Sequence, residues 1–188
     1  MEYLVTDKPY PRGELCVKGN NVFHGYFKRE DKTAEAFDEQ GWFCTGDVVV
    51  AYPNGTVRIV DRSKNIFKLS QGEYIAPEKL ENIYVQSAFI AQIMIYGDSF
   101  KNNTVGIIVV DPETAKLWGS KNGGIDTPDV INNADFKAEV FDDILKLSKS
   151  NKLSGLERPA DIHLTLDAFS AENEILTPTF KLKRNVGK

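Results

Sequence analysis

The sequence predicts an α+β fold in two parts, a small antiparallel β subdomain followed by a compact α+β domain. Two observations predict this class. An Asn54-Gly55 turn separates two β-branched runs, and an amphipathic helix that begins at Pro77 needs a sheet to cover its apolar face. The chain has 188 residues, with 41% hydrophobic and 27% charged residues, which is the composition of a folded protein of one or two domains.

The first part is expected to contain a strand, a short helix and a hairpin. Apolar and polar residues alternate over 13–19, which predicts a half-buried strand. Charged residues mixed with alanine predict a helix over 28–37 that ends before Gly41. The runs 48–52 and 56–60 lie on either side of the Asn-Gly turn, so they are predicted to pair as an antiparallel hairpin.

The second part follows a charged boundary segment at 63–65. Its helix from Pro77 is expected to carry Leu80, Ile83, Tyr84 and Ser87 on one face. Short strands are predicted at 66–69 and 74–75, longer strands at 90–96, 104–110 and 162–166, and further helices at 112–118 and 135–149. Residues 126–133 and 151–159 are expected to be connections, and 176–188 a basic extended tail.

Composition and charge exclude several classes of function. The net charge of −4 gives no support for nucleic-acid binding. No apolar run approaches the roughly 20 residues of a membrane helix, and the first eleven residues do not have the pattern of a targeting segment. The cysteines and histidines, at Cys16, Cys44, His24 and His163, do not have the spacing of a metal site. A reducing compartment, and hence a cytoplasmic location, is expected.

Three features could carry chemistry, and each has a simpler alternative. Asp47 in Thr45-Gly46-Asp47 could accept hydrogen bonds from a diol, or could cap a turn. A charge cluster at the boundary could bind phosphate, or could be a solvated linker. Its members are Asp61, Arg62, Lys64 and Lys68. Lys181, Lys183 and Arg184 could form a functional basic segment, or a flexible terminus.

The order and surroundings of these features resemble the C-terminal part of the long-chain fatty acid–CoA ligases, which belong to the adenylate-forming superfamily. The resemblance covers nearly the whole chain. It runs through GELCVKG at 13–19, NVFHGY at 21–26, GWFCTGD at 41–47, DRSKNIFKL at 61–69, QGEYIAPEKLE at 71–81 and LTPTFKLKR at 176–184. The final segment and residues 67–84 favour the long-chain fatty acyl branch over amino-acid-adenylating relatives.

The resemblance implies a role for each candidate residue. Asp47 is expected to bind both ribose hydroxyls of ATP or of the acyl-adenylate, and Arg62 to lie at the ribose and phosphate side. Lys64 matches the family's hinge, so residues 1–63 would be the last β subdomain of the large AMP-binding domain and 64–188 the C-terminal lid domain. Lys68 matches a lysine of the thioester-forming pose. Lys181 matches the catalytic lysine of the adenylation pose, with Lys183 as the alternative.

The resemblance also implies what this chain lacks. The superfamily's phosphate loop, its adenine-covering motif, its magnesium ligands and its fatty-acid tunnel belong to the N-terminal domain, and none of them is present here. ATP or AMP, CoA and Mg²⁺ are therefore expected as ligands of a full-length enzyme, with a long-chain fatty acid as substrate. Such an enzyme could associate with membranes such as the endoplasmic reticulum. The chain alone is expected to be inactive; the alternative is a non-catalytic nucleotide- or CoA-binding module derived from such an enzyme.

Overall fold

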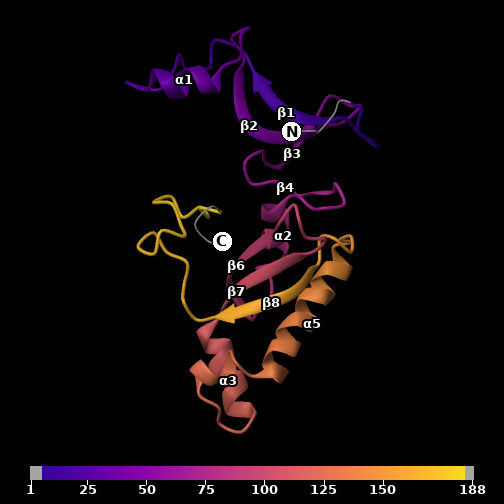
Figure 1. The fold of residues 1–188 in the computed structure, drawn as a ribbon, viewed down its shortest axis with the longest axis vertical. Helices are drawn as coiled ribbons and strands as arrows, with labels where there is room; N and C mark the ends of the chain where they lie inside the picture. Colours follow the sequence, from indigo (N-terminus) through magenta and orange to yellow (C-terminus); the bar gives the residue numbers. More distant parts are fainter. Residues whose placement is uncertain (1–5, 185–188) are drawn as a thin grey trace. The chain divides into compact units, whose positions relative to one another are not determined.

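The computed structural model describes residues 6–184 and divides into two compact units, Met1–Ile66 and Phe67–Lys188. The sequence places the boundary slightly earlier, after Ser63. The model combines helices with small sheets, so the predicted α+β class is confirmed (Figure 1). Within residues 6–184, no helix combines the length and the hydropathy that crossing a bilayer requires.

The first unit is a three-stranded antiparallel sheet with one short helix, as predicted. Its strand order is β1-β2-β3, and its elements are β1 (Arg12–Val17), α1 (Glu30–Ala36), β2 (Phe43–Ala51) and β3 (Val57–Arg62). The hairpin between β2 and β3 turns where Gly55 has a φ of +82°, a conformation that favours glycine. The Asn54 side chain fixes the turn, because its Oδ1 accepts hydrogen bonds from the amide and hydroxyl of Thr56.

Few hydrophobic side chains are buried in the first unit. Val48, Val49 and Val50 of β2 are buried. Beside the sheet, the rings of Phe23, Tyr26, Phe37 and Phe43 form a cluster with centroids 5.0–5.7 Å apart. This aromatic cluster packs the segment before α1 against the start of β2.

The second unit is built around a three-stranded sheet of order β6-β7-β8. Its elements are β4 (Phe67–Lys68), β5 (Tyr74–Ile75), α2 (Pro77–Tyr84), β6 (Ile90–Gly97), β7 (Thr104–Val110), α3 (Pro112–Lys121), α4 (Thr127–Val130), α5 (Ala134–Ser150) and β8 (Pro159–Thr165). Strands β6 and β7 are antiparallel, whereas β7 and β8 are parallel and joined through helices α3 to α5. Figure 1 shows α5 running along this sheet.

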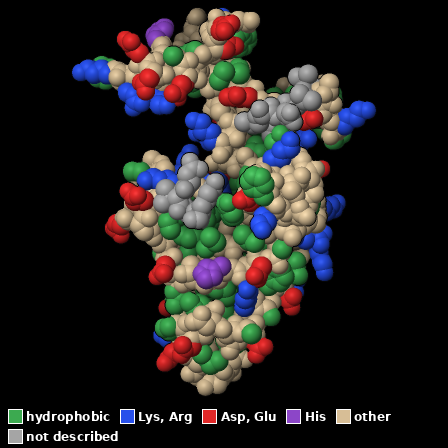
Figure 2. Space-filling model, in the orientation of Figure 1, with side chains coloured by type: hydrophobic (Ala, Val, Ile, Leu, Met, Phe, Trp, Pro, Cys, Tyr) green, Lys and Arg blue, Asp and Glu red, His purple; other side chains and the backbone are tan. Residues whose placement is uncertain are grey.

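Both faces of the central sheet are covered. On one face, side chains such as Ile95, Ile108 and Ile162 join the main core with Leu80 of α2 and Ile144 of α5. The opposite face buries Met94 and Val109 against the C-terminal segment, in a second cluster that includes Phe169 and Leu176. Hydrophobic side chains remain visible between charged ones on the surface of this unit (Figure 2), as is usual for folded domains.

Three predictions for the second unit are wrong. Residues 126–133 are not only a connection, because they contain α4, which begins with Thr127 and Pro128. Ser87 does not lie on the α2 face, since that helix ends at Tyr84, although Ser87 is buried beyond it. The segment 176–184 is not an extended tail but a folded turn; residues 185–188 of the predicted tail lie outside the described residues.

Candidate functional site

Asp47 and Arg62 are brought together by the β2–β3 hairpin. They are paired residues in the strand register, and Arg62 Nε lies 3.1 Å from Asp47 Oδ1. The Asp47 side chain is 24% exposed and the Arg62 side chain 57% exposed, so the pair is open to solvent. An open carboxylate beside a guanidinium can bind a ligand that carries both hydroxyl and phosphate groups.

Asp47 lies at a bulge in β2 that is held from both sides. Gly46 has a φ of +75°; its amide donates to Glu14 Oε1 at 3.0 Å, and its carbonyl accepts from the Ser63 amide at 2.7 Å. Thr45 Oγ1 donates to the Leu15 carbonyl at 2.8 Å and accepts from the Asp47 amide. These bonds position the Asp47 backbone. Glu14 was not a candidate in the sequence, although it lies within the GELCVKG segment.

The members of the boundary charge cluster differ in burial, so the cluster is not simply a solvated linker. Asp61 is buried, and its Oδ1 accepts from the Arg62 amide at 2.6 Å and from Asn65 Nδ2 at 3.3 Å. It therefore stabilises the turn after β3. Lys64 lies in that turn and is exposed. Arg62 and Lys64 line a cavity of about 650 Å³ in the first unit, together with Glu14, Cys44 and Gly46.

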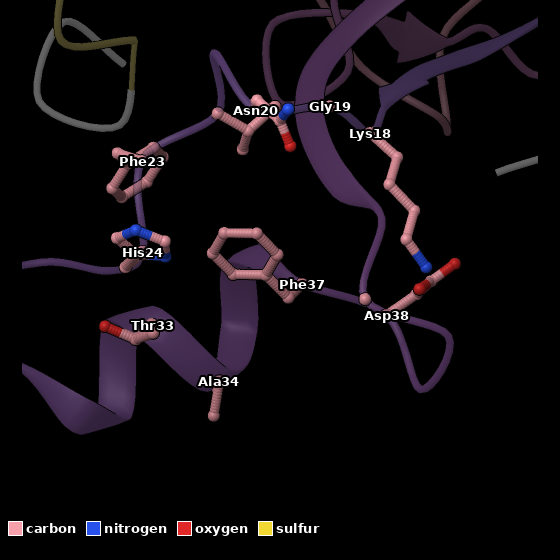
Figure 3. Close-up of a pocket in the computed structure, with 11 residues that line it drawn as sticks. Lys18, Gly19, Asn20, Phe23, His24, Thr33, Ala34, Phe37 and Asp38 are labelled. Carbon is pink, nitrogen blue, oxygen red and sulfur yellow. The ribbon is translucent and has the colours of Figure 1, made fainter.

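A larger cavity in the first unit, of about 880 Å³, contains none of the predicted site residues. Figure 3 shows the rings of Phe23, His24 and Phe37 around it, with Thr33 and Ala34 of α1 on one side. Thr33 shapes this wall, because its hydroxyl accepts from the Tyr26 amide at 2.9 Å. Among the residues that line the cavity, the acidic side chain is Asp38 and the hydroxyl side chain is Thr33. Together with His24 they do not define a reaction.

Lys68 belongs to the second unit and lies on β4. Its side chain is exposed, with Nζ 5.3 Å from the centroid of the Tyr74 ring on the paired strand β5. Gly72 forms the turn between the two strands at a φ of +90°, and its amide donates to the Leu69 carbonyl. The short β4–β5 hairpin therefore presents the Lys68 ammonium group to solvent on an ordered support.

Lys181 lies on a tight turn in the second unit. Phe180 has a φ of +59°, the Thr177 amide donates to the Lys181 carbonyl at 2.7 Å, and the Lys181 amide donates to Thr177 Oγ1 at 3.0 Å. Leu176 and Leu182 pair below the turn and pack on the sheet. Lys181 is exposed whereas Lys183 is half-buried, so the two lysines do not share one environment as simple alternation predicts.

A buried ion pair fixes the end of this turn. Arg184 Nη1 and Nη2 donate to Glu81 Oε1 and Oε2 at 2.8 and 2.7 Å, and the two side chains are 13% and 10% exposed. Glu81 Oε1 also accepts from the Ile95 amide at 2.8 Å. The Arg184–Glu81 clamp thus ties the turn with Lys181 to α2 and β6. Sequence reasoning missed it, although Glu81 is a charged residue on the buried face of α2.

The predicted site residues divide between the units. The first unit contains Asp47, Arg62 and Lys64, and the second contains Lys68 and Lys181. Among residues 6–184, no group of three or more His, Cys, Asp or Glu side chains is arranged to hold a metal ion. The carboxylate and guanidinium of the first unit suit a nucleotide, and the exposed ammonium groups of the second suit a negatively charged reacting group.

Comparison with curated proteins identifies close relatives. The chain is 46% identical over its full length to long chain acyl-CoA synthetase 6, peroxisomal, of Arabidopsis thaliana, and 49% identical over 92% of its length to human long-chain-fatty-acid–CoA ligase 6. It spans only about a quarter of these relatives, 27% and 25% of their lengths. No protein-family model matches the chain.

Solved structures show the same fold. The adenylation domain of a carboxylate reductase from Mycobacterium chelonae matches 98% of the chain with a TM-score of 0.85 and 36% identity, and the chain covers 27% of that structure. O-succinylbenzoate CoA synthetase from Bacillus subtilis, in complex with AMP, matches 95% of the chain with a TM-score of 0.63; at 22% identity it supports the fold alone, over 30% of its own length. The relatives of this chain are thus long-chain acyl-CoA synthetases and fatty acid–CoA ligases, and its fold is that of part of an adenylation domain, in each case over about a quarter of the longer protein.

Proposed function

We propose that this chain is the C-terminal part of an ATP-dependent long-chain fatty acid–CoA ligase. Such an enzyme converts a fatty acid, ATP and CoA into acyl-CoA, AMP and diphosphate through an acyl-adenylate. The observation that carries the proposal is the identity of 46–49% to relatives named as long-chain synthetases and ligases over 92% or more of the chain. The geometry supports it, because Asp47 and Arg62 stand side by side on an open surface.

In this proposal the first unit binds the nucleotide. Asp47 accepts hydrogen bonds from the two ribose hydroxyls, which fit two carboxylate oxygens. Arg62 holds that carboxylate in place and adds positive charge on the phosphate side. The hydrogen bonds of Thr45 and Glu14 hold the β2 bulge in place, so little ordering is required when the ligand binds.

The lysines of the second unit serve the two half-reactions. A carboxylate that attacks the α-phosphorus is repelled by the negatively charged oxygens around that atom. The Lys181 ammonium group lowers this repulsion in the transition state. Lys68 serves the later thioester step, in a second pose of the unit. Lys64 is the hinge, which is supported by its exposed place in the turn just before the division between the units.

Nucleotide and CoA are ligands of the full-length enzyme in this proposal. Magnesium is assigned no residue in this chain, because the family resemblance puts its ligands in the large N-terminal domain. We place its ligands in the part of the relatives' length that this chain does not span. The isolated chain is therefore expected to form no acyl-CoA from palmitate or oleate, and measurable ATP- and CoA-dependent turnover would contradict this.

A chimera tests the proposal directly. In human long-chain-fatty-acid–CoA ligase 6, this chain would replace the matching 25% of the length. In that chimera Lys181→Ala should slow adenylate formation by about 10²–10³-fold but leave thioester formation from supplied acyl-adenylate within a few-fold. Lys68→Ala should show the reverse pattern, because it acts in the other pose.

Lys183→Ala is the matched control, two residues from Lys181 on the same segment. It should reduce adenylation much less than Lys181→Ala does. Equal losses in both half-reactions for Lys181→Ala, or a larger loss for Lys183→Ala, would show that the catalytic lysine is assigned wrongly. A chimera that folds but forms no adenylate with the wild-type segment would contradict the proposed function itself.

A further inference from the structure

Two thiols face each other on the paired strands β1 and β2 of the first unit. Cys16 of β1 and Cys44 of β2 are directly paired in the antiparallel register, with their Sγ atoms 3.4 Å apart. The Cys16 thiol donates a hydrogen bond to Cys44 Sγ. Both side chains are half-buried, both are free thiols, and they are the two cysteines of the whole sequence. Neither has a part in the proposed ligase chemistry.

The backbone already has the geometry that a disulfide requires. Paired residues in an antiparallel ladder have Cα atoms about 4.5–5.5 Å apart. Disulfides join Cα atoms about 4.4–6.8 Å apart. Side-chain rotation alone therefore has to bring the sulfur atoms from 3.4 Å to the bonded distance of about 2.05 Å.

We propose that Cys16 and Cys44 form a reversible dithiol site that is oxidised to an intramolecular disulfide by a small disulfide such as glutathione disulfide. One thiolate attacks the external disulfide, which forms a mixed disulfide and releases one glutathione thiolate. The second thiolate then attacks the protein sulfur of that mixed disulfide and releases the second glutathione. Two protein thiols lose two protons and two electrons, and one glutathione disulfide becomes two glutathione thiols.

The surroundings of the two thiols indicate which of them attacks the external disulfide first. Burial, the hydrogen bond to Cys44 and the nearby negative charges of Cys44, Glu14 and Asp38 raise the pKa of Cys16 to about 11. Cys16 is therefore a poor initiating nucleophile at neutral pH. Cys44 lines the cavity of about 650 Å³, whereas Cys16 is not among its lining residues, so a small disulfide that enters the cavity meets Cys44 first. Cys44 thus makes the first attack, and Cys16 resolves the mixed disulfide.

The cross-link would lie next to the β2 bulge that carries Asp47. Thr45 follows Cys44 directly, and its hydroxyl already bonds to the Leu15 carbonyl across the same two strands. A disulfide would add a covalent tie between β1 and β2 at this point. It would close the part of the chain between Cys16 and Cys44, which includes α1. The thiol pair has this geometry whether or not the chain belongs to a ligase.

To test this, the 188-residue chain is oxidised in glutathione buffers and its remaining thiols are alkylated. The intact protein and its peptides are then analysed by mass spectrometry. The expected product is a monomer that has lost about 2 Da and contains a Cys16–Cys44 cross-linked peptide. Cys16→Ser and Cys44→Ser should each give at most a single glutathione adduct. Glutathione adducts or dimers of the wild-type chain without the internal bond would overturn the proposal.

A matched control moves one thiol to the other face of the strand. The double variant C16S/V17C keeps two thiols, but residue 17 points away from Cys44 because side chains alternate along β1. It should close at least about tenfold less readily than the wild type. Equal closure would contradict the proposal. If this variant does not fold, the comparison is made with the wild-type chain in urea, where loss of the native pairing should reduce closure to the same extent.

Discussion

In the second unit, seventeen buried side chains form one hydrophobic cluster, whereas in the described part of the first unit the buried hydrophobic side chains are Val48, Val49 and Val50. Some aromatic side chains of the first unit also add little to a core, because they are exposed. Tyr26 is 50% exposed and Phe27 is 88% exposed. Since buried apolar area is the main source of folding free energy, the second unit is expected to be stable alone and the first to be marginal.

The proposed site residues therefore rest on parts of the chain that differ in packing. The Asp47–Arg62 pair depends on a thin sheet that is held mainly by backbone and side-chain hydrogen bonds. Lys68 and Lys181 stand on a well-packed domain. The chain offers a separate reporter for each unit, because its two tryptophans are Trp42 in the first unit and Trp118 in the second. Trp118→Phe isolates the Trp42 signal, and Trp42→Phe isolates the Trp118 signal.

The largest expected effect is on the core of the second unit. Phe136 is fully buried, with edge contacts to the Phe89 and Trp118 rings. Phe136→Ala should lower the free energy of unfolding reported by Trp118 by about 3–5 kcal/mol. Chemical denaturation should show no change in the Trp42 transition. If both transitions shift together, the two units unfold in one cooperative step, which would contradict their separate stabilities. Phe100→Ala is the control, since Phe100 is 87% exposed and should change stability by less than about 0.5 kcal/mol.

A somewhat smaller effect is expected at the Arg184–Glu81 clamp. Glu81→Gln leaves the Arg184 guanidinium buried without its charge partner, which should cost the second unit about 3 kcal/mol. Hydrogen exchange should also become faster at the Lys181 and Lys183 amides, since the clamp fixes this turn. Glu113→Gln, at an exposed position in the first turn of α3, should change neither. Unchanged exchange in Glu81→Gln would mean that the turn is held by the packing of Leu176 and Leu182 alone.

The smallest expected effect is a pH dependence confined to the second unit. Burial of Glu157 opposes its ionisation, but hydrogen bonds from Lys79 and Ser154 outweigh it, so the pKa of Glu157 lies below its ordinary value of 4.5. A lowered folded-state pKa stabilises the protein above the unfolded-state value, and that stabilisation is lost as the pH falls through the folded-state value. Glu157→Gln should therefore reduce the loss of Trp118-reported stability on acidification.

Asp161→Asn is the matched control for the pH dependence. A hydrogen bond from Lys137 also lowers the pKa of Asp161, but this carboxylate is largely exposed and screened by solvent. Its replacement should leave the acid profile nearly unchanged. A profile that responds to Asp161 and not to Glu157 would show that surface charge, and not the half-buried ion pair with Lys79, governs the acid stability of this unit.

Local sequence signals predicted most of the fold. The Asn54-Gly55 turn, the proline at the start of α2 and the apolar runs of β6 and β7 each depend on neighbours along the chain. The residue pattern raised Asp47, Arg62 and Lys181 as candidates, each with a simpler alternative, and the family resemblance gave each of them a role. The buried role of Asp61 was missed, because its partner Asn65 and its burial under the turn emerge only in three dimensions. The Arg184–Glu81 clamp was missed because a separation of 103 residues leaves no local signal.

That separation has a consequence for the order of folding. Closing a contact over 103 residues costs more loop entropy than any hairpin of this unit, so the pair gains stability only after α2 and the sheet have formed. The turn with Lys181 is then the last segment of the second unit to dock, after α2 and the central sheet have formed. The clamp thereby makes the finished domain a precondition for a correctly placed ammonium group.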